Sequence, residues 1–344
     1  MDLERIKVEI GKLSIEDQAL LAAELEKLTL KGSPTVKAQA SRRHILDNKQ
    51  GCCPHCSHPK YVRFGIDRGA QRYKCKSCRR SFTEYTGTWM AGLHKKDKVD
   101  AYLVLMLEEK SLDKIKESLK INKKTAFDWR HKILASLTDT DQDDFTGITE
   151  SDETFFLNSE KGKTPKGRES RKRGGVSSKR GVNKDHVAVI VTQDRKSGLD
   201  LTVATMGRIK KSDIQKAIGD RINTSQTILC SDAHVSYKGF AKDQNIEHHP
   251  LKGIIKQRVK DKIYHIQHVN STHNRIKKWI DNAFWGVATK YLQQYLNWFK
   301  LKEQLKNNKD QALLFVQKTV LDVNAIKNYR NIEVQYQKLI STQI

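Results

Sequence analysis

The most informative absence from this chain of 344 residues is a long apolar segment. No stretch approaches the ~18 consecutive apolar residues that a membrane-spanning helix needs. The first residues, MDLERIKVEIGKL, also lack the apolar core of a secretory signal peptide. These two absences argue against a membrane-embedded or exported protein, and we expect a cytoplasmic one.

Acidic residues are scarce relative to basic ones. The chain has 40 Asp and Glu against 64 Lys and Arg, which gives a net charge of +24. An excess of this size indicates a polyanionic partner such as nucleic acid, although a generically basic protein is the alternative. The hydrophobic content of 37% supports ordinary cores, and the length fits two or three domains.

Cysteine is also infrequent, but four of the six cysteines form two close pairs. The motifs are CPHC at 53–56 and CKSC at 75–78, a spacing typical of a zinc ribbon. The expected zinc ligands are Cys53, Cys56, Cys75 and Cys78. His55 and His58 are alternative ligands. We expect a hairpin between the pairs, and zinc would supply much of the folding energy of such a small module.

Many Arg and Lys residues surround these motifs, so the ribbon is interpreted as a DNA contact, with a purely structural role as the alternative. Before it, residues 1–30 show two short amphipathic helices. These helices serve either DNA-end binding or multimerisation, or are a packing appendage. Residues 31–49 are expected to be a polar, basic linker.

After the ribbon, the periodicity from Asp97 to Leu137 becomes helical. Three successive helices are expected, and their length and order fit a helix-turn-helix. The third, at 125–134, would present polar residues to the major groove of DNA. These residues are Lys123, Lys124, Thr125, Asp128, Arg130 and His131. Three packed helices without DNA contact are the alternative. An acidic linker at 138–144 leads onward.

From residue 148 the pattern alternates between short apolar runs and amphipathic segments. Strands are expected at 148–156, 186–192, 199–204, 227–230 and 245–249. Helices are expected at 212–222, at 236–243 and onward to the end of the chain. This order is that of a ribonuclease H-like fold, an α/β domain with a mixed five-stranded sheet flanked by helices. The zinc ribbon and the helix-turn-helix precede it.

The resulting division of the chain has five segments. They are N-terminal helices and linker at 1–49, the zinc ribbon at 50–92, the helix-turn-helix at 93–140, the catalytic domain at 145–305 and C-terminal helices at 306–344. Within the catalytic domain, residues 160–184 form a basic loop rich in Gly and Ser. Arg171, Lys172 and Arg173 in this loop are expected to contact DNA phosphates without reading bases.

Two acids occupy the centre of the apolar run ITESDETFF, at 148–156. An unpaired buried charge is costly, so Asp152 and Glu153 need a metal ion or an ion pair. In a ribonuclease H-like fold the first and fourth strands are adjacent. Asp152 is therefore expected next to Asp232, which ends the fourth strand. Glu153 would point to the opposite face of a regular strand and is interpreted as a supporting residue.

Taken together, these motifs resemble bacterial insertion-sequence transposases of the DDE superfamily, in the ISXO-like group with a zinc ribbon before the catalytic domain. The resemblance covers about residues 50–300 and rests on CPHC…CKSC, SDETFF, LCSDAHVSY, HIQHVNSTHNRIKKW and GVATKYLQQYLNWF. In that group one metal-binding Asp lies in the first strand and another follows the fourth. The resemblance thus implies Asp152 and Asp232.

The group's third active-site position lies on a late helix and varies among Glu, Asn and His. Aligning HIQHVN with the group's motif implies Asn270, and Lys277 follows seven residues later on the same helix face. His268 and His273 are alternatives for the third position. An Asn can donate a carbonyl oxygen to a metal but brings no charge, so the chain departs from the strict pattern of three acids.

The resemblance implies DNA cleavage and strand transfer with Mg²⁺ or Mn²⁺ held by Asp152, Asp232 and Asn270. Lys277 would neutralise a phosphate. The implied partner is double-stranded DNA, both the terminal inverted repeats of the element and the target, bound by a homodimer or larger assembly at the bacterial nucleoid. The alternative function is a DNA-binding regulator without catalysis, or an inactive relic, for which Asn270 is the main support.

Overall fold

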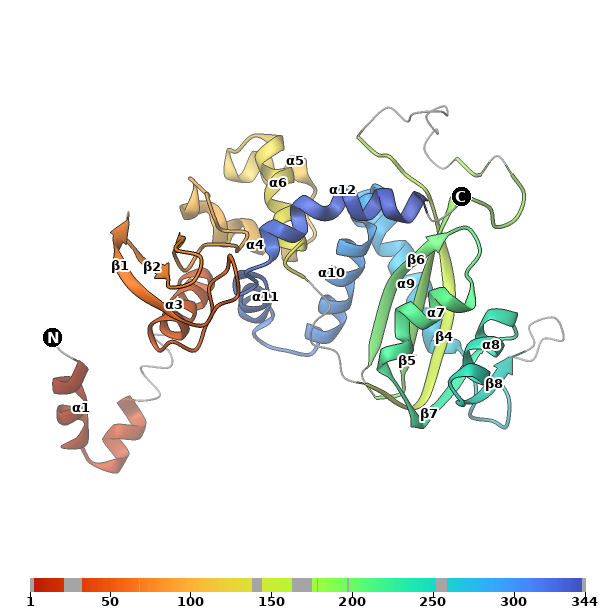
Figure 1. Ribbon diagram of the computed structural model, residues 1–344, viewed down its shortest axis with the longest axis horizontal. Coiled ribbons are helices and arrows are strands. Elements are labelled where there is room, and N and C mark those ends of the chain that lie inside the picture. The colour runs from red at the N-terminus through yellow and green to blue at the C-terminus, as the bar shows by residue number, and fades with distance from the viewer. Residues whose placement is uncertain are drawn as a thin grey trace. The chain divides into compact units, whose positions relative to one another are not determined.

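The structure is a computed structural model that describes residues 3–21, 33–67, 69–137, 144–162, 175–177, 179–196, 198–251 and 259–341. The chain divides into two compact units, traced in Figure 1. The first comprises Met1–Tyr85 and Lys95–Asp100, and the second Thr86–His94 and Ala101–Ile344. No helix in the described ranges is long and apolar enough to cross a membrane.

The first unit begins with helices. They are α1 (Leu3–Gly11), a second helix described over 15–21, α3 (Pro34–Asp47) and the 3₁₀ helix η1 (Lys96–Lys98). The prediction of a linker over 31–49 was therefore wrong for Pro34–Asp47. Ser33 caps α3 by accepting a hydrogen bond from the backbone N–H of Val36, and Pro34 occupies the first turn. Both are helix-start signals.

The ribbon of the first unit is a three-stranded antiparallel sheet, in the order β1-β2-β3. Its strands are β1 (Tyr61–Asp67), β2 (Ala70–Cys75) and β3 (Ser81–Phe82). Tyr61, Tyr73 and Phe82 pack against one another with ring centroids 5.4–5.7 Å apart. The Tyr61 hydroxyl donates to the backbone oxygen of Leu46. The ribbon core therefore closes on the end of α3.

The three helices expected before residue 137 are confirmed. They are α4 (Val99–Leu107), α5 (Leu112–Leu119) and α6 (Lys123–Leu134). Ser111 caps α5 and Asn122 caps α6, each through its side-chain oxygen. Ile115 and Ile133 are fully buried between the helices. The acidic linker at 138–144 lies outside the described residues except for Asp144.

The main sheet has the strand order β6-β5-β4-β7-β8. Its strands are β4 (Phe145–Leu157), β5 (His186–Asp194), β6 (Leu199–Met206), β7 (Ile222–Asp232) and β8 (Glu247–Leu251). β5 is antiparallel to β4 and β6, whereas β4, β7 and β8 are parallel. With the strands numbered in chain order, the arrangement is 3-2-1-4-5, and the expected ribonuclease H-like fold is confirmed.

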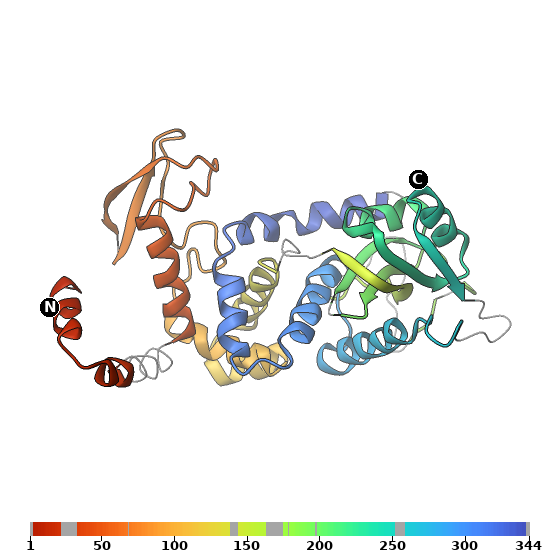
Figure 2. The same ribbon diagram turned by 90° about the horizontal axis from the view of Figure 1, so that it is seen from below.

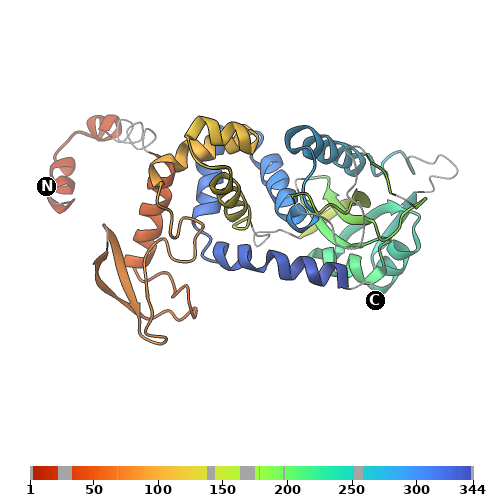
Figure 3. The same cartoon turned by 90° about the horizontal axis from the view of Figure 1, so that it is seen from above.

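Helices cover both faces of this sheet. Helices α7 (Lys211–Ile218) and α8 (Val235–Asp243) bury Ile214, Ile218 and Phe240 in one core with β4, β5 and β7. A 3₁₀ turn η2 (Gly219–Arg221) ends α7, so β7 begins five residues earlier than the expected residue 227. Helix α9 (Gln267–Phe284) lies on the opposite face, as Figures 2 and 3 show from below and above.

The remaining helices pack around α6 and the sheet. They are η4 (Thr289–Tyr291), α10 (Leu292–Leu305), α11 (Gln311–Val320) and α12 (Ala325–Ser341). The side chain of Gln293 holds the edge strand β6, donating to the backbone oxygen of Leu201 and accepting from the backbone N–H of Val203. Asn297 on the same helix donates to the backbone oxygen of Leu137, after α6. α10 therefore joins α6 to the sheet.

Candidate active site

The two predicted aspartates meet at the end of the parallel strand pair. β4 and β7 remain in register up to Ser151 and Ser231, and the next residue on each strand is Asp152 and Asp232. One carboxylate oxygen from each lies within 4.8 Å of the other. The proximity predicted from the strand order is confirmed, because equivalent positions on adjacent parallel strands lie side by side.

Glu153 belongs to the same group, and the expectation that it points away from the aspartates was wrong. Its carboxylate oxygen lies within 4.8 Å of those of Asp152 and Asp232. The pairing of β4 with β7 ends at Ser151, while β4 continues to Leu157. Side chains at 152 and 153 therefore border an open strand edge, where residues from both sheet faces can converge. We call Asp152, Glu153 and Asp232 the carboxylate trio.

The carboxylate trio is electrostatically strained. Burial, together with the charges of Glu153 and Asp232, raises the pKa of Asp152 to about 8. Burial and the charge of Asp232 raise the pKa of Glu153 to about 7. In addition, Glu153 Oε2 is buried and accepts no hydrogen bond within the described residues. Hard oxygen ligands in this arrangement fit a divalent cation, which would relieve the repulsion.

Helix α9 contributes a histidine to the same region. His273 is 8% exposed, and burial and the Lys277 cation lower its pKa to about 4, against the effect of a hydrogen bond with the Asp152 backbone. Within the described residues, His273 Nε2 is a buried nitrogen without a hydrogen-bond partner. Asn270 and Lys277, one turn before and one turn after, are exposed. α9 therefore contacts β4 at Asp152.

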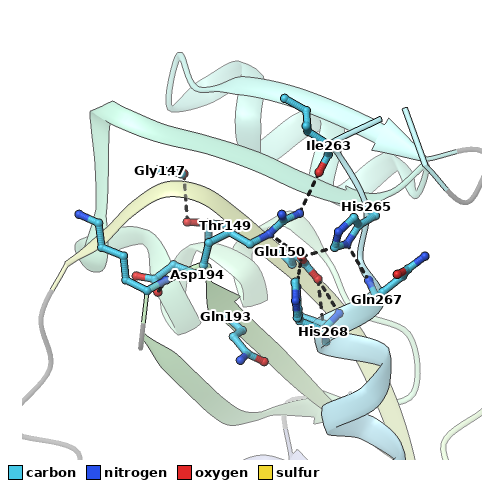
Figure 4. Close-up of polar contacts among 12 residues, drawn as sticks. Gly147, Thr149, Glu150, Gln193, Asp194, Ile263, His265, Gln267 and His268 are labelled. Carbon is cyan, nitrogen blue, oxygen red and sulfur yellow. Dashed lines mark hydrogen bonds and ion pairs between the residues drawn. The ribbon is translucent and has the colours of Figure 1, made fainter. Parts of the chain in front are cut away.

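His268 does not share this contact. It lies with His265 around the carboxylate of Glu150, which Figure 4 shows at the start of α9. Glu150 is on β4, two residues before Asp152, and is fully buried. Sequence reasoning did not single it out, although a glutamate in an apolar strand is itself a signal that a partner exists.

The four ribbon cysteines form the second candidate metal centre. All four Sγ atoms lie within 4.8 Å of one another, and the Cys53–Cys78 and Cys56–Cys75 pairs are 3.7 Å apart. A tetrahedral zinc site with Zn–S bonds of about 2.3 Å has sulfur separations of about 3.8 Å. The spacing is far longer than a disulfide bond. The cysteine set therefore fits zinc.

The predicted DNA-contacting residues divide into three groups. Lys123 and Lys124 are exposed at the start of α6, with ion pairs to Asp113 and Asp128. Thr125 is partly exposed beside them. Arg171, Lys172 and Arg173 lie outside the described residues.

The third group corrects the prediction. Arg130 and His131 are 2% and 3% exposed, so they cannot reach a DNA groove as predicted. The Arg130 guanidinium donates to the backbone oxygen of Lys110 and lies over the rings of Phe284 and Trp298. Both residues fall on the inward face of α6, where they join α6 to the C-terminal helices.

Comparison with known proteins gives a consistent result. Residues 144–304 match the ISXO2-like transposase domain. The chain is 26% identical over 274 residues to an uncharacterized protein of the transposable element ISH50 from Halobacterium salinarum, covering 78% of this chain and 90% of that protein.

Two solved structures are also similar. A pre-cleavage Mos1 transpososome has a TM-score of 0.28 at 12% identity, over 70% of this chain and 80% of that one. The Mos1 strand transfer complex has a TM-score of 0.28 at 11% identity, over 73% and 79%. Because both scores are low, the fold assignment rests on the strand order.

Proposed function

We propose that this chain, whose residues 144–304 match the ISXO2-like transposase domain, is a DDE-type transposase that cleaves and joins DNA at the carboxylate trio. The observation that carries the proposal is the meeting of Asp152, Glu153 and Asp232 at the end of β7. The bound cation would be Mg²⁺ or Mn²⁺, since carboxylates are the ligands that these ions prefer.

A pair of such cations activates an attacking oxygen and stabilises a leaving oxygen in phosphoryl transfer. The chain's own contribution is to hold three acidic side chains on two rigid strands, with geometry fixed before DNA arrives. Lys277, exposed on α9, is proposed to contact a phosphate near the scissile bond as a point charge.

The third active-site position is proposed as Asn270, exposed on the first turn of α9. His273, one turn later, contacts Asp152 through the backbone and is the remaining alternative. His268, the other alternative, contacts Glu150 and does not belong to the carboxylate trio, which favours Asn270 over it. Glu153 supplies the acidic oxygen that Asn270 lacks, so the total of three carboxylates is preserved.

Zinc held by Cys53, Cys56, Cys75 and Cys78 is proposed to be structural for the ribbon. Double-stranded DNA is the proposed partner because of the net charge of +24. Lys123, Lys124 and Thr125 on α6 would contact the terminal repeats, and Arg171, Lys172 and Arg173 the backbone. Joining two ends requires at least a homodimer. The five-segment division, with boundaries near 50, 93, 145 and 306, is part of this proposal.

The test is single-turnover cleavage of duplexes that carry the element ends, with Mg²⁺ present. Asp152→Asn and Asp232→Asn should each abolish cleavage and leave end binding within about threefold. Asp281→Asn, which removes an exposed acid from α9, is the matched control and should cleave normally. Cleavage by either site variant at the wild-type rate would disprove the assignment.

A regulator without catalysis is the second candidate, and Asn270 in place of an acid is the observation that favours it. It predicts specific end binding but no cleavage by the wild-type chain under any divalent cation. Inverted repeats flanked by short direct repeats around the gene would instead favour an active transposase.

A further inference from the structure

The carboxylate of Glu150 is engaged by several groups at once. It is fully buried in β4 and accepts hydrogen bonds or ion pairs from three side chains and two backbone amides. None of these contacts belongs to the carboxylate trio. Because an isolated buried charge is costly, these partners are needed to stabilise the carboxylate, and the contacts in turn hold the groups that make them.

One oxygen of Glu150 completes the start of α9. The helix has Ile266 as its N-cap, and Ile266 provides no side-chain cap. The first intrahelical bond runs from Asn270 N–H to the Ile266 oxygen. The two preceding amides, of His268 and Val269, donate to Glu150 Oε2 at 2.9 and 3.4 Å. Glu150 therefore caps the helix from a strand 118 residues earlier in the chain.

The other oxygen fixes the segment that leads into α9. His268 Nδ1 lies 2.7 Å and His265 Nδ1 3.2 Å from Glu150 Oε1. Figure 4 draws both contacts as dashed lines. Arg195 Nε lies 3.0 Å from the same oxygen, and Arg195 Nη2 donates to the backbone oxygen of Ile263. The guanidinium already neutralises the carboxylate. This arrangement opposes a metal ion at Glu150, His265 and His268, although their ligand atoms are close enough for one.

Glu150 and Asp152 are two residues apart on β4, so their side chains leave the same face of the strand. α9 meets β4 at both places, through Glu150 at its first turn and through His273 at the Asp152 backbone. The first turn also carries Asn270. A charged acceptor beside the positive end of a helix is favourable, and its charge-assisted bonds are directional.

We propose that Glu150 is a positioning residue that clamps the first turn of α9 to β4 and thereby sets Asn270 and His273 against the carboxylate trio. The predicted effect on catalysis rests on the proposed nuclease function. The contact between Glu150 and α9 does not depend on that function. Glu150 touches neither DNA nor metal in this role. Its loss should reduce the rate of the chemical step and leave DNA affinity unchanged.

The test compares Glu150→Gln with two other variants of the full-length protein. Glu150→Asp keeps the charge on a shorter side chain and should restore part of the effect. Asp200→Asn is the matched control, since Asp200 is 1% exposed on β6 and pairs with Arg221 and Lys300, away from α9. It reports the general effect of removing a buried, paired carboxylate from the same sheet.

Two readouts separate the clamp from the chemistry. The first is amide hydrogen exchange in the metal-free protein: Glu150→Gln should speed exchange at His268 and Val269 by at least about tenfold, and Asp200→Asn should not. The second is single-turnover cleavage of pre-bound DNA, which should fall by roughly 10- to 100-fold in Glu150→Gln. The Kd for DNA should change by less than about twofold.

Each pattern of results has one meaning. Faster exchange without a cleavage defect, in a wild type that cleaves, overturns the positioning role. Faster exchange in a protein that never cleaves keeps the clamp and rejects the nuclease function. Unchanged exchange rejects the clamp. If Glu150→Gln does not fold, His268→Gln, which removes a half-exposed partner of the same carboxylate, is measured in its place. Zinc or Mn²⁺ binding that disappears with His265→Ala would establish a metal site and overturn the proposal.

Discussion

Glu153 was expected on the opposite face of β4 from Asp152, but its carboxylate lies with those of Asp152 and Asp232. Glu153→Gln removes one of three acidic side chains that repel one another when ionised, while keeping the size of the side chain. We expect divalent-metal affinity to fall by about 10- to 100-fold, because one charged ligand is lost. We also expect the metal-free protein to become more stable, since Glu153 raises the pKa of its neighbour Asp152. Mn²⁺ titration and thermal unfolding in EDTA measure the two effects.

Asp281→Asn serves as the control, because it changes the net charge equally from an exposed position on α9. A Glu153→Gln variant that binds Mn²⁺ as tightly as the wild type would show that Glu153 only accompanies the aspartates. A loss of metal-free stability would show that the Glu153 carboxylate is stabilised by its surroundings and is not mainly repelled by the aspartates.

The pKa of His131 provides a prediction for pH dependence. Its ring packs against Phe127 and Tyr291, and burial lowers its pKa to about 4, with Arg130 and Lys290 lowering it and Asp128 raising it. In the unfolded chain His131 becomes protonated near pH 6.5, whereas in the folded chain it becomes protonated only near pH 4. Stability is thus fully present above pH 6.5 and falls as the pH decreases towards 4, by up to about 3 kcal/mol from this group.

His131→Asn should remove this component, so the difference in unfolding free energy between wild type and variant should shrink between pH 7 and pH 4. Urea unfolding at several pH values measures it. The control is His94→Asn, at an exposed histidine. The difference in unfolding free energy between this variant and the wild type should be the same at every pH. A wild-type-like pH slope in His131→Asn would show that other histidines carry the effect.

At the scale of elements, the ribbon gives a prediction about metal. Cys56→Ser removes one of four thiolates and should abolish tight zinc binding, because a structural site needs all four ligands. β1, β2 and β3 should then become accessible to trypsin at their many basic residues, since the module has little core of its own. The sheet of the second unit should keep its thermal transition.

Cys52→Ser is the matched control for the ribbon. Cys52 is exposed beside the first pair and lies outside the cysteine cluster. It should retain zinc and protease resistance, as measured by metal analysis and limited proteolysis. Loss of zinc from Cys52→Ser but not from Cys56→Ser would contradict the ligand set.

Predictability also varied from element to element. The existence and apolar spacing of α5 and α6 were readable, because periodicity marks an amphipathic helix, although α6 begins at Lys123, two residues before the expected start. Which residues of α6 are buried could not be predicted from the sequence. Arg130 has the composition of a DNA contact, but only the tertiary arrangement shows that Phe284 and Trp298, more than 150 residues later, cover it. Because the chain has 64 Lys and Arg residues, composition alone does not separate those that bind phosphate from those that are buried.

The same limit applies to the candidate site. The meeting of Asp152 and Asp232 followed from strand order, because parallel register carries one aspartate to the other. The inclusion of Glu153 depended on where β7 ends relative to β4, which strand alternation alone does not reveal. The role of Glu150 depended on a helix that starts 117 positions later, at Gln267, and lacks its own cap.

At the scale of the whole molecule, the net charge of +24 makes salt the most direct probe of DNA binding. Each neutralised phosphate contributes about −0.9 to the slope of log K against log salt. Replacing Arg171, Lys172 and Arg173 by alanine should make this slope shallower by about 3. Affinity for element ends and for unrelated duplexes should fall together, because phosphate contacts do not distinguish sequences.

The control for this triple variant carries alanine at Lys306, Lys309 and Lys318, which are exposed in the C-terminal part of the chain. It has the same net charge, so an effect of net charge alone would change the salt dependence of DNA binding equally in both variants. Filter binding at several salt concentrations, on end-containing and unrelated duplexes, measures both slopes. Equal slopes for the two triple variants would mean that the protein's field as a whole attracts DNA. A shallower slope only for the variant at Arg171, Lys172 and Arg173 would assign the phosphate contacts to these three residues.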